Sequence, residues 1–97
     1  MTRQEVIDKL HENMDHIKET FDVDHIALFG SFSRDEAGPE SDVDILVRFM
    51  HASTFRGYFG LLEYLEDLFG RSVDLVNEKA LRKELAPYVR EDLIDVA

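Results

Sequence analysis

Two short apolar runs limit what this chain can fold into, because each is joined to residues that an ordinary core strand lacks. The first run ends in Gly30 and Ser31. The second opens ten residues later with Asp42 and Asp44. Side chains alternate between the two faces of a strand, so the second run, 42–49, predicts a strand with apolar side chains on one face and both carboxylates on the other. The sequence therefore predicts functional residues at the ends of two core strands.

The other elements are predicted from periodicity and end signals. Thr2 and Glu5 fit a capping box, and Thr54 and Gly70 fit the start and end of another helix. Apolar spacing predicts helices at 3–20, 31–36, between Thr54 and Gly70, and from 79 to the C-terminus with a division at Pro87; strands are predicted at 25–29, 42–49 and 72–76. The third helix is expected to bury a stripe formed by Phe55, Phe59, Leu62, Leu65 and Phe69. This alternation of helices and strands predicts one α/β domain over residues 1–97.

Composition narrows the function classes. The chain of 97 residues has 11 basic and 21 acidic residues and a net charge of −10. Such a charge repels a phosphate backbone, so we expect no direct nucleic-acid partner and favour cations or a basic protein. There is no cysteine, and no apolar run approaches the roughly 18 residues of a membrane span. The charged, amphipathic N-terminus differs from a secretory signal, so a cytoplasmic protein without membrane contact is expected.

Three aspartates form a candidate metal centre. Asp42 and Asp44 project from one face of a strand, where like charges repel unless a cation lies between them. Asp74 interrupts the apolar run Val73–Val76, and a carboxylate there is costly to desolvate unless it is paired or binds a metal. Oxygen ligands without cysteine or nearby histidine favour Mg²⁺, or Mn²⁺, over zinc. Three such carboxylates would hold two ions about 4 Å apart, the arrangement of phosphoryl displacement.

The Gly-Ser pair suits the same chemistry. Gly30 would let a phosphate approach the backbone, and the helix start would offer unpaired N–H groups. The Ser31 hydroxyl would add a neutral donor, and Arg34, one turn further on, could reach the same phosphates. These three residues are the candidate nucleotide-binding group.

Simpler interpretations exist for each candidate. The acids could be solvated strand-edge residues, Ser31 a helix N-cap, and Arg34 an ordinary exposed arginine. A second Asp-x-Asp, Asp22-Val23-Asp24, has no Gly-Ser upstream and is interpreted as a loop. The four histidines share no metal-binding spacing.

With ten residues between Gly30-Ser31 and Asp42-Val43-Asp44, and with "LFGRSVDLV" downstream, the chain resembles the DNA polymerase β-like nucleotidyltransferase superfamily, in particular its minimal nucleotidyltransferase (MNT) domains. The resemblance covers essentially the whole chain. It implies a small mixed sheet of three to four strands flanked by helices. It also implies that Asp42, Asp44 and Asp74 bind the metals, and that Asp74 helps to activate the acceptor hydroxyl. One residue departs from the family pattern, because Asp35 stands where the family usually has glycine.

The resemblance also implies a partner. Small members of this family act as antitoxins of helical HEPN-type ribonuclease toxins and transfer AMP from ATP to a toxin tyrosine, within a hetero-oligomer. Two alternatives stay open: a nucleotide-binding antitoxin that only masks the toxin, and a nucleotidyltransferase acting on a small molecule. The intact set of three aspartates favours an enzyme over a mask.

Overall fold

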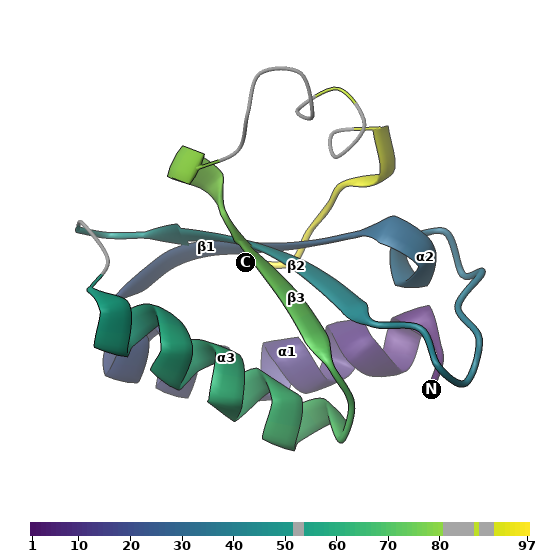
Figure 1. Cartoon of the computed structure of the whole chain (residues 1–97), viewed down its shortest axis with the longest axis horizontal. Coiled ribbons are helices and arrows are strands. Elements are labelled where there is room, and N and C mark those ends of the chain that lie inside the picture. Colours follow the sequence, from purple (N-terminus) through teal and green to yellow (C-terminus); the bar gives the residue numbers. More distant parts are fainter. Residues whose placement is uncertain (52–53, 81–86, 88–90) are drawn as a thin grey trace.

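The computed structural model describes residues 1–51, 54–80, 87 and 91–97. Three α-helices, one short 3₁₀ helix and a four-stranded sheet make up this part of the chain (Figure 1). In chain order the elements are α1 (Arg3–Phe21), β1 (Val23–Phe29), α2 (Gly30–Ser33), β2 (Val43–Phe49), α3 (Phe55–Phe69), β3 (Val73–Asn77), η1 (Glu78–Ala80) and β4 (Ile94–Asp95). The predicted α/β class with a small mixed sheet is confirmed.

The sheet has the strand order β3-β2-β1-β4, in which only the β2–β3 pair is parallel. Figure 1 shows α1 and α3 together beneath this sheet. The two helices cover one face because each carries apolar residues at helical spacing, and Tyr64 of α3 donates a hydrogen bond to Asn13 of α1 at 2.8 Å. Along β2, the opposite face carries Asp44, the buried Leu46 and the exposed Arg48.

The core lies between the sheet and the two helices. Alternation along β2 places Val43, Ile45 and Val47 against the helices, each fully buried. Apolar side chains of all the main elements join them in one cluster: Val6, Leu10, Met14, Ile17, Val23, Ile26, Leu28, Phe32, Phe49, Leu61, Leu65, Phe69, Val73, Leu75 and Val96. The site residues are thus carried on strands whose other face is anchored in the core.

The predicted helix ends hold at α1 and α3. Thr2 and Glu5 form the capping box, and the Thr54 hydroxyl accepts the Gly57 backbone N–H at 2.9 Å. Gly70 ends α3 in the left-handed conformation at φ +65°. These signals are local, so the sequence alone defines them.

Other predictions need correction. The helix predicted at 31–36 is shorter and begins at Gly30, because the chain turns at Asp35. The strands shift by one or two residues at their ends. Asp22-Val23-Asp24 is not wholly a loop: Asp22 ends α1, and the two residues after it begin β1.

The predicted stripe of α3 is partly wrong. Leu65 and Phe69 are buried as expected, but Phe55 is 79% exposed and Phe59 is 47% exposed, while Leu61 takes the buried place. The predicted stripe and the buried residues Leu61, Leu65 and Phe69 both have helical spacing. The packing of α3 on the sheet decides which of them faces inward.

The C-terminal helix prediction agrees with the structure at residues 87, 91 and 92, which are helical, and fails at the end of the chain. The helix was expected to continue to the end of the chain, whereas Ile94–Asp95 forms β4, antiparallel to β1. Residues 81–86 and 88–90, which the same prediction covered, lie outside the described residues. None of the helices in the described part combines the length and apolar character of a membrane span.

Candidate active site

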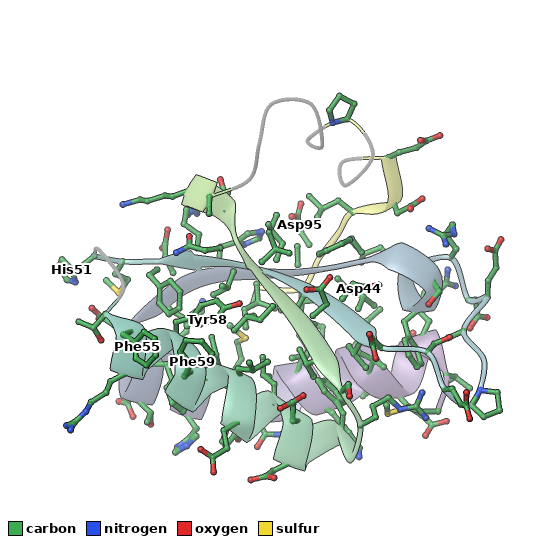
Figure 2. All side chains as sticks on the ribbon, in the orientation of Figure 1. Asp44, His51, Phe55, Tyr58, Phe59 and Asp95 are labelled. Atoms are coloured by element: carbon green, nitrogen blue, oxygen red, sulfur yellow. The ribbon has the colours of Figure 1, made fainter. Side chains whose placement is uncertain are left out.

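Parallel pairing of β2 and β3 brings two of the three predicted aspartates together. Asp44 and Asp74 are directly opposite in the register of these strands. Asp42 lies immediately before β2, two residues from Asp44. Asp42 and Asp74 are exposed. Asp44, labelled in Figure 2, is half-buried. The sequence placed Asp42 and Asp44 on one strand face, and the register adds Asp74 from the neighbouring strand.

The three carboxylates interact electrostatically. The pKa of Asp44 is raised from 3.8 to about 6, first by burial and then by the negative charges of Asp74 and Asp42. Arg34 opposes this shift. A carboxyl group held half-buried among like charges is poised to gain from a cation.

Gly30 lies against this carboxylate. Phe29 pairs with Asp44 across β1 and β2, so the next residue begins α2 beside the Asp44 side chain. Gly30 has φ +74°, and a Cβ there would come within 2.0 Å of Asp44 Oδ2. The glycine was predicted for the close approach of a phosphate. The structure shows a further reason, because the space beside Gly30 is occupied by the Asp44 carboxylate.

Helix α2 is a single turn that holds Ser31 at the edge of the site. Ser31 is half-buried, and its carbonyl oxygen accepts the Glu36 backbone N–H at 2.9 Å. The buried Ser33 hydroxyl donates to the Gly30 carbonyl at 2.9 Å, and Phe32 anchors the turn in the core. These hydrogen bonds and the buried Phe32 ring hold the Gly30-Ser31 turn in place.

Arg34 follows this turn and is already paired. Its guanidinium donates to Asp92 Oδ2 at 2.5 Å and to Glu36 Oε2 at 3.1 Å. Arg34 also lowers the pKa of Asp44, so its positive charge acts on this carboxylate. Any phosphate that Arg34 binds must compete with these two carboxylates.

Two residues near the site were missed from the sequence. Arg71 donates to the Ser41 carbonyl at 3.2 Å, and its guanidinium lies 5.1 Å from the centre of the Phe32 ring. It thus ties the loop that leads into Asp42 to helix α2. Asp92, from the C-terminal segment, holds Arg34. The arginine in "LFGRSVDLV" was visible, but neither contact partner lies near it in sequence.

Asp35, the departure from the family pattern, has a left-handed backbone with φ +59°. This conformation just after a helix favours glycine, and aspartate is one of the residues that tolerates it. The Asp35 carboxylate accepts the Arg3 backbone N–H at 3.4 Å, at the first turn of α1. A glycine here would adopt this backbone without strain, and the aspartate instead gains a hydrogen bond at the N-terminus of α1.

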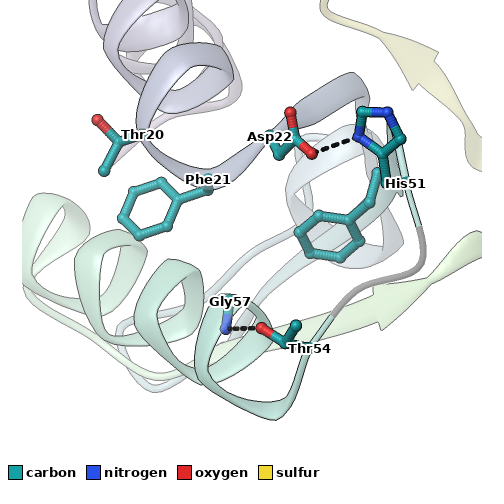
Figure 3. Close-up of a pocket in the computed structure, with 7 residues that line it drawn as sticks. Thr20, Phe21, Asp22, His51, Thr54 and Gly57 are labelled. Atoms are coloured by element: carbon teal, nitrogen blue, oxygen red, sulfur yellow. Dashed lines mark hydrogen bonds and ion pairs between the residues drawn. The ribbon is translucent and has the colours of Figure 1, made fainter.

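In the described part of the chain, neither a preformed metal cluster nor the pocket drawn in Figure 3 coincides with the three aspartates. Among residues 1–51, 54–80, 87 and 91–97, no three histidine or acidic side chains are gathered closely enough to hold a metal ion as they stand. A pocket of about 210 Å³ lies at the far end of β2 from Asp44, lined by Phe49 and by residues of α1 and α3 (Figure 3). In that pocket Asp22 contacts His51 at 2.7 Å, so the second Asp-x-Asp belongs to a different part of the molecule.

Comparison with known proteins shows which class of protein has this fold. Residues 7–96 match the nucleotidyltransferase domain family, and the chain belongs to that family. A Methanocaldococcus jannaschii protein that is named as a protein adenylyltransferase is 40% identical to this chain, with 98% of each chain covered. The protein adenylyltransferase MntA of Thermococcus cleftensis is 38% identical over 99% of this chain and 97% of its own length.

Solved structures agree on the fold. A minimal nucleotidyltransferase superposes with a TM-score of 0.80 at 31% identity, covering 97% of this chain and 95% of that one. A chain from the complex of tri-AMPylated Shewanella oneidensis HEPN toxin with MNT antitoxin gives a TM-score of 0.69 at 19% identity, covering 99% of this chain and 72% of that one. The resemblance to minimal nucleotidyltransferases is confirmed.

Proposed function

We propose that this chain transfers AMP from ATP to a tyrosine hydroxyl of a HEPN-type ribonuclease toxin and so acts as the antitoxin of that protein. The observation that carries the proposal is the facing pair Asp44 and Asp74, with Gly30 packed against the Asp44 carboxylate. The adenylyltransferase relatives and the fold shared with an MNT antitoxin support the choice of reaction and partner.

The aspartates suit Mg²⁺ or Mn²⁺ in their chemistry. The donor set is all carboxylate, and burial together with the repulsion among these groups raises the pKa of Asp44 to about 6. Asp42 and Asp44 would hold both ions, and Asp74 would hold the one beside the acceptor. Bound there, the cations would neutralise charge on the phosphates and favour ionisation of the acceptor hydroxyl.

The residues of the chain then have separate tasks. Gly30, Ser31 and Arg34 bind and orient the triphosphate, and Arg34 exchanges a carboxylate partner for phosphate. The acceptor oxygen forms a bond to the α-phosphorus, the bond from that phosphorus to the β-phosphate bridge breaks, and pyrophosphate leaves. The phenolic proton passes to the Asp74 carboxylate and then to water. This leaves an adenylate ester on the acceptor.

Intact-mass spectrometry of the HEPN-type protein co-expressed with this chain tests the proposal. We expect a gain of one or more adenylate masses with the wild-type chain. Asp42→Asn or Asp44→Asn should lower the transfer rate at least about a thousandfold, because each removes a charged ligand. Asp24→Asn, in the second Asp-x-Asp, is the matched control and should transfer normally. Near-normal transfer by Asp44→Asn would refute the assignment.

The masking alternative has its own readout. The Asp42→Asn, Asp44→Asn double variant is expected to fold and to lose protection against the toxin. If it gave full protection at matched expression, with no mass added to the toxin, the chain would act as a mask. Transfer to a small molecule is less well supported, because the pocket beside Phe49 lies at the far end of β2 from the carboxylates.

A further inference from the structure

The large exposed apolar side chains of the described residues come from one stretch of the chain. Met50, Phe55 and Phe59 are the large apolar side chains that are exposed there, and they fall within ten residues of sequence. The rings of Phe55 and Phe59 contact each other at an interplanar angle of 43°, with centres 4.6 Å apart. We call these two residues the aromatic flank of α3. Two exposed phenylalanines in contact, one of them 79% exposed, form an apolar patch of the kind that marks an interaction surface.

The aromatic flank is linked to the candidate active site. Tyr58 lies between them: its ring centre is 5.0 Å from that of Phe59, and its hydroxyl donates to the Leu75 carbonyl in β3. Leu75 directly follows Asp74 in β3, so Tyr58 contacts the strand that carries this carboxylate. Figure 2 shows Tyr58 with Phe55 and Phe59 on the same flank of α3. The exposed rings are thus continuous with the strand that carries Asp74.

The strand order sets the direction from which an acceptor approaches. Gly30 and Ser31 follow β1, Asp44 lies on β2, and Asp74 lies on β3 at the edge of the sheet. With the nucleotide phosphates on the β1 side, the acceptor hydroxyl must come from the β3 side. On that side α3 packs against β3, and the first turns of α3 carry the aromatic flank.

The edge of β3 is partly closed to an added strand. The Tyr58 hydroxyl donates a hydrogen bond to the Leu75 carbonyl, and Glu66 Oε2 accepts the Val73 backbone N–H at 3.2 Å. These side chains of α3 take up backbone groups that an incoming strand would need. A partner on this side therefore has helix side chains to contact rather than a free strand edge.

We propose that the aromatic flank, Phe55 and Phe59, is the docking surface for the acceptor protein. The inference rests on the proposed function and adds the place of contact. Exposed Glu63 and Asp67 follow on the same helix, and the net charge is −10. The partner surface that fits has apolar side chains bordered by lysine or arginine.

The test is the double variant Phe55→Ser, Phe59→Ser, with the HEPN-type protein as acceptor. We expect transfer at sub-saturating acceptor to fall about 10- to 100-fold, through KM for the acceptor, as for loss of aromatic anchors at an interface. ATP binding by the chain alone should stay unchanged. Arg56→Ser, an exposed change in the same helical turn, is the matched control and should transfer normally. Thermal denaturation of all three proteins checks that they fold.

A photo-crosslinking residue gives an independent measurement. Benzoylphenylalanine in place of Phe55 should crosslink to the HEPN-type protein, and in place of Glu12, on the exposed side of α1, it should not. Equal transfer by the double variant and the wild type, or crosslinks only to a second copy of this chain, would overturn the docking surface. If the wild type itself transfers nothing, the proposed function fails instead, and a crosslink from position 55 still reports the contact.

Discussion

Gly30 is the residue in which backbone and site depend on each other most directly. Gly30→Ala would put a Cβ 2.0 Å from Asp44 Oδ2 at a φ of +74°. We expect about 1–2 kcal/mol of backbone strain, together with displacement of the carboxylate and loss of nucleotide transfer. Thermal denaturation and the transfer rate measure the two effects.

Gly70→Ala is the control for this prediction. Gly70 also has a positive φ, +65°, but a Cβ added there would meet open space, with nothing within 4 Å. It should lose similar stability from strain and keep its transfer rate. If both variants lose activity to the same extent, the contact between Gly30 and Asp44 has no role in the site.

The raised pKa of Asp44 predicts a pH dependence of stability. The folded protein holds this proton up to about pH 6, whereas the unfolded chain releases it near 3.8. The stability from this group is therefore present below about pH 4 and is lost as pH rises through about 6. Asp44→Asn should be more stable than wild type at about pH 7.5 without divalent metal, by about 1 kcal/mol after allowance for solvent screening, with no gain at about pH 4.

Denaturant unfolding at the two pH values measures this difference. Asp24→Asn, which removes the carboxylate 2.6 Å from Arg48, is the control and should give no such gain. A stability difference for Asp44→Asn that is the same at both pH values would contradict the electrostatic account.

Residue types in the site could be predicted from sequence, but their contacts could not. The spacing of Gly30, Asp42 and Asp44 indicated a phosphate and metal site because strand alternation and backbone freedom are local properties. The position of Asp74 opposite Asp44 depends on the parallel register of two strands separated by α3. The packing of Gly30 on Asp44 depends on the β1–β2 register, which no local pattern specifies.

At the scale of elements, the same division holds. Helix α1 was predicted almost to the residue, because its capping box and its buried side chains are all local signals. Helix α3 was predicted with the right ends and a partly wrong buried face, since apolar residues occupy more than one side of it. Strand β4 was missed because two residues carry no strand signal of their own. It forms only through pairing with Ala27 and Leu28 of β1.

The C-terminal segment reaches the candidate active site through Asp92. Because Asp92 holds Arg34 at 2.5 Å, it competes with any phosphate for that guanidinium. Asp92→Asn should therefore tighten ATP binding about threefold to tenfold, by releasing Arg34 and removing a negative charge. Isothermal titration with ATP and Mg²⁺ measures the change.

Asp95→Asn is the matched control, since Asp95 lies in the same segment and contacts His25 at 2.9 Å rather than Arg34. It should bind ATP as the wild type does. Weaker binding by Asp92→Asn would mean that Asp92 aligns Arg34 for the phosphates instead of competing with them.

At the scale of the whole molecule, the net charge of −10 makes stability depend on ionic conditions. Like charges spread over a small domain repel, and salt screens them over a distance of about 10 Å at 0.1 M. The thermal midpoint of the wild type should therefore rise with NaCl. A specific ion at the carboxylates would add a separate term that depends on its concentration relative to its Kd.

MgCl₂ and NaCl compared at equal ionic strength separate the two terms. At ten times its Kd, bound Mg²⁺ would stabilise the wild type by about 1.4 kcal/mol, which raises the midpoint of a domain this size by roughly 5–10 °C beyond NaCl. The Asp42→Asn, Asp44→Asn double variant should show only the NaCl-like rise, whereas Asp24→Asn should keep both. This measurement needs neither ATP nor a partner, so it tests the metal site independently of the reaction. An equal Mg²⁺ effect in the wild type and the double variant would show that Asp42 and Asp44 do not bind the metal.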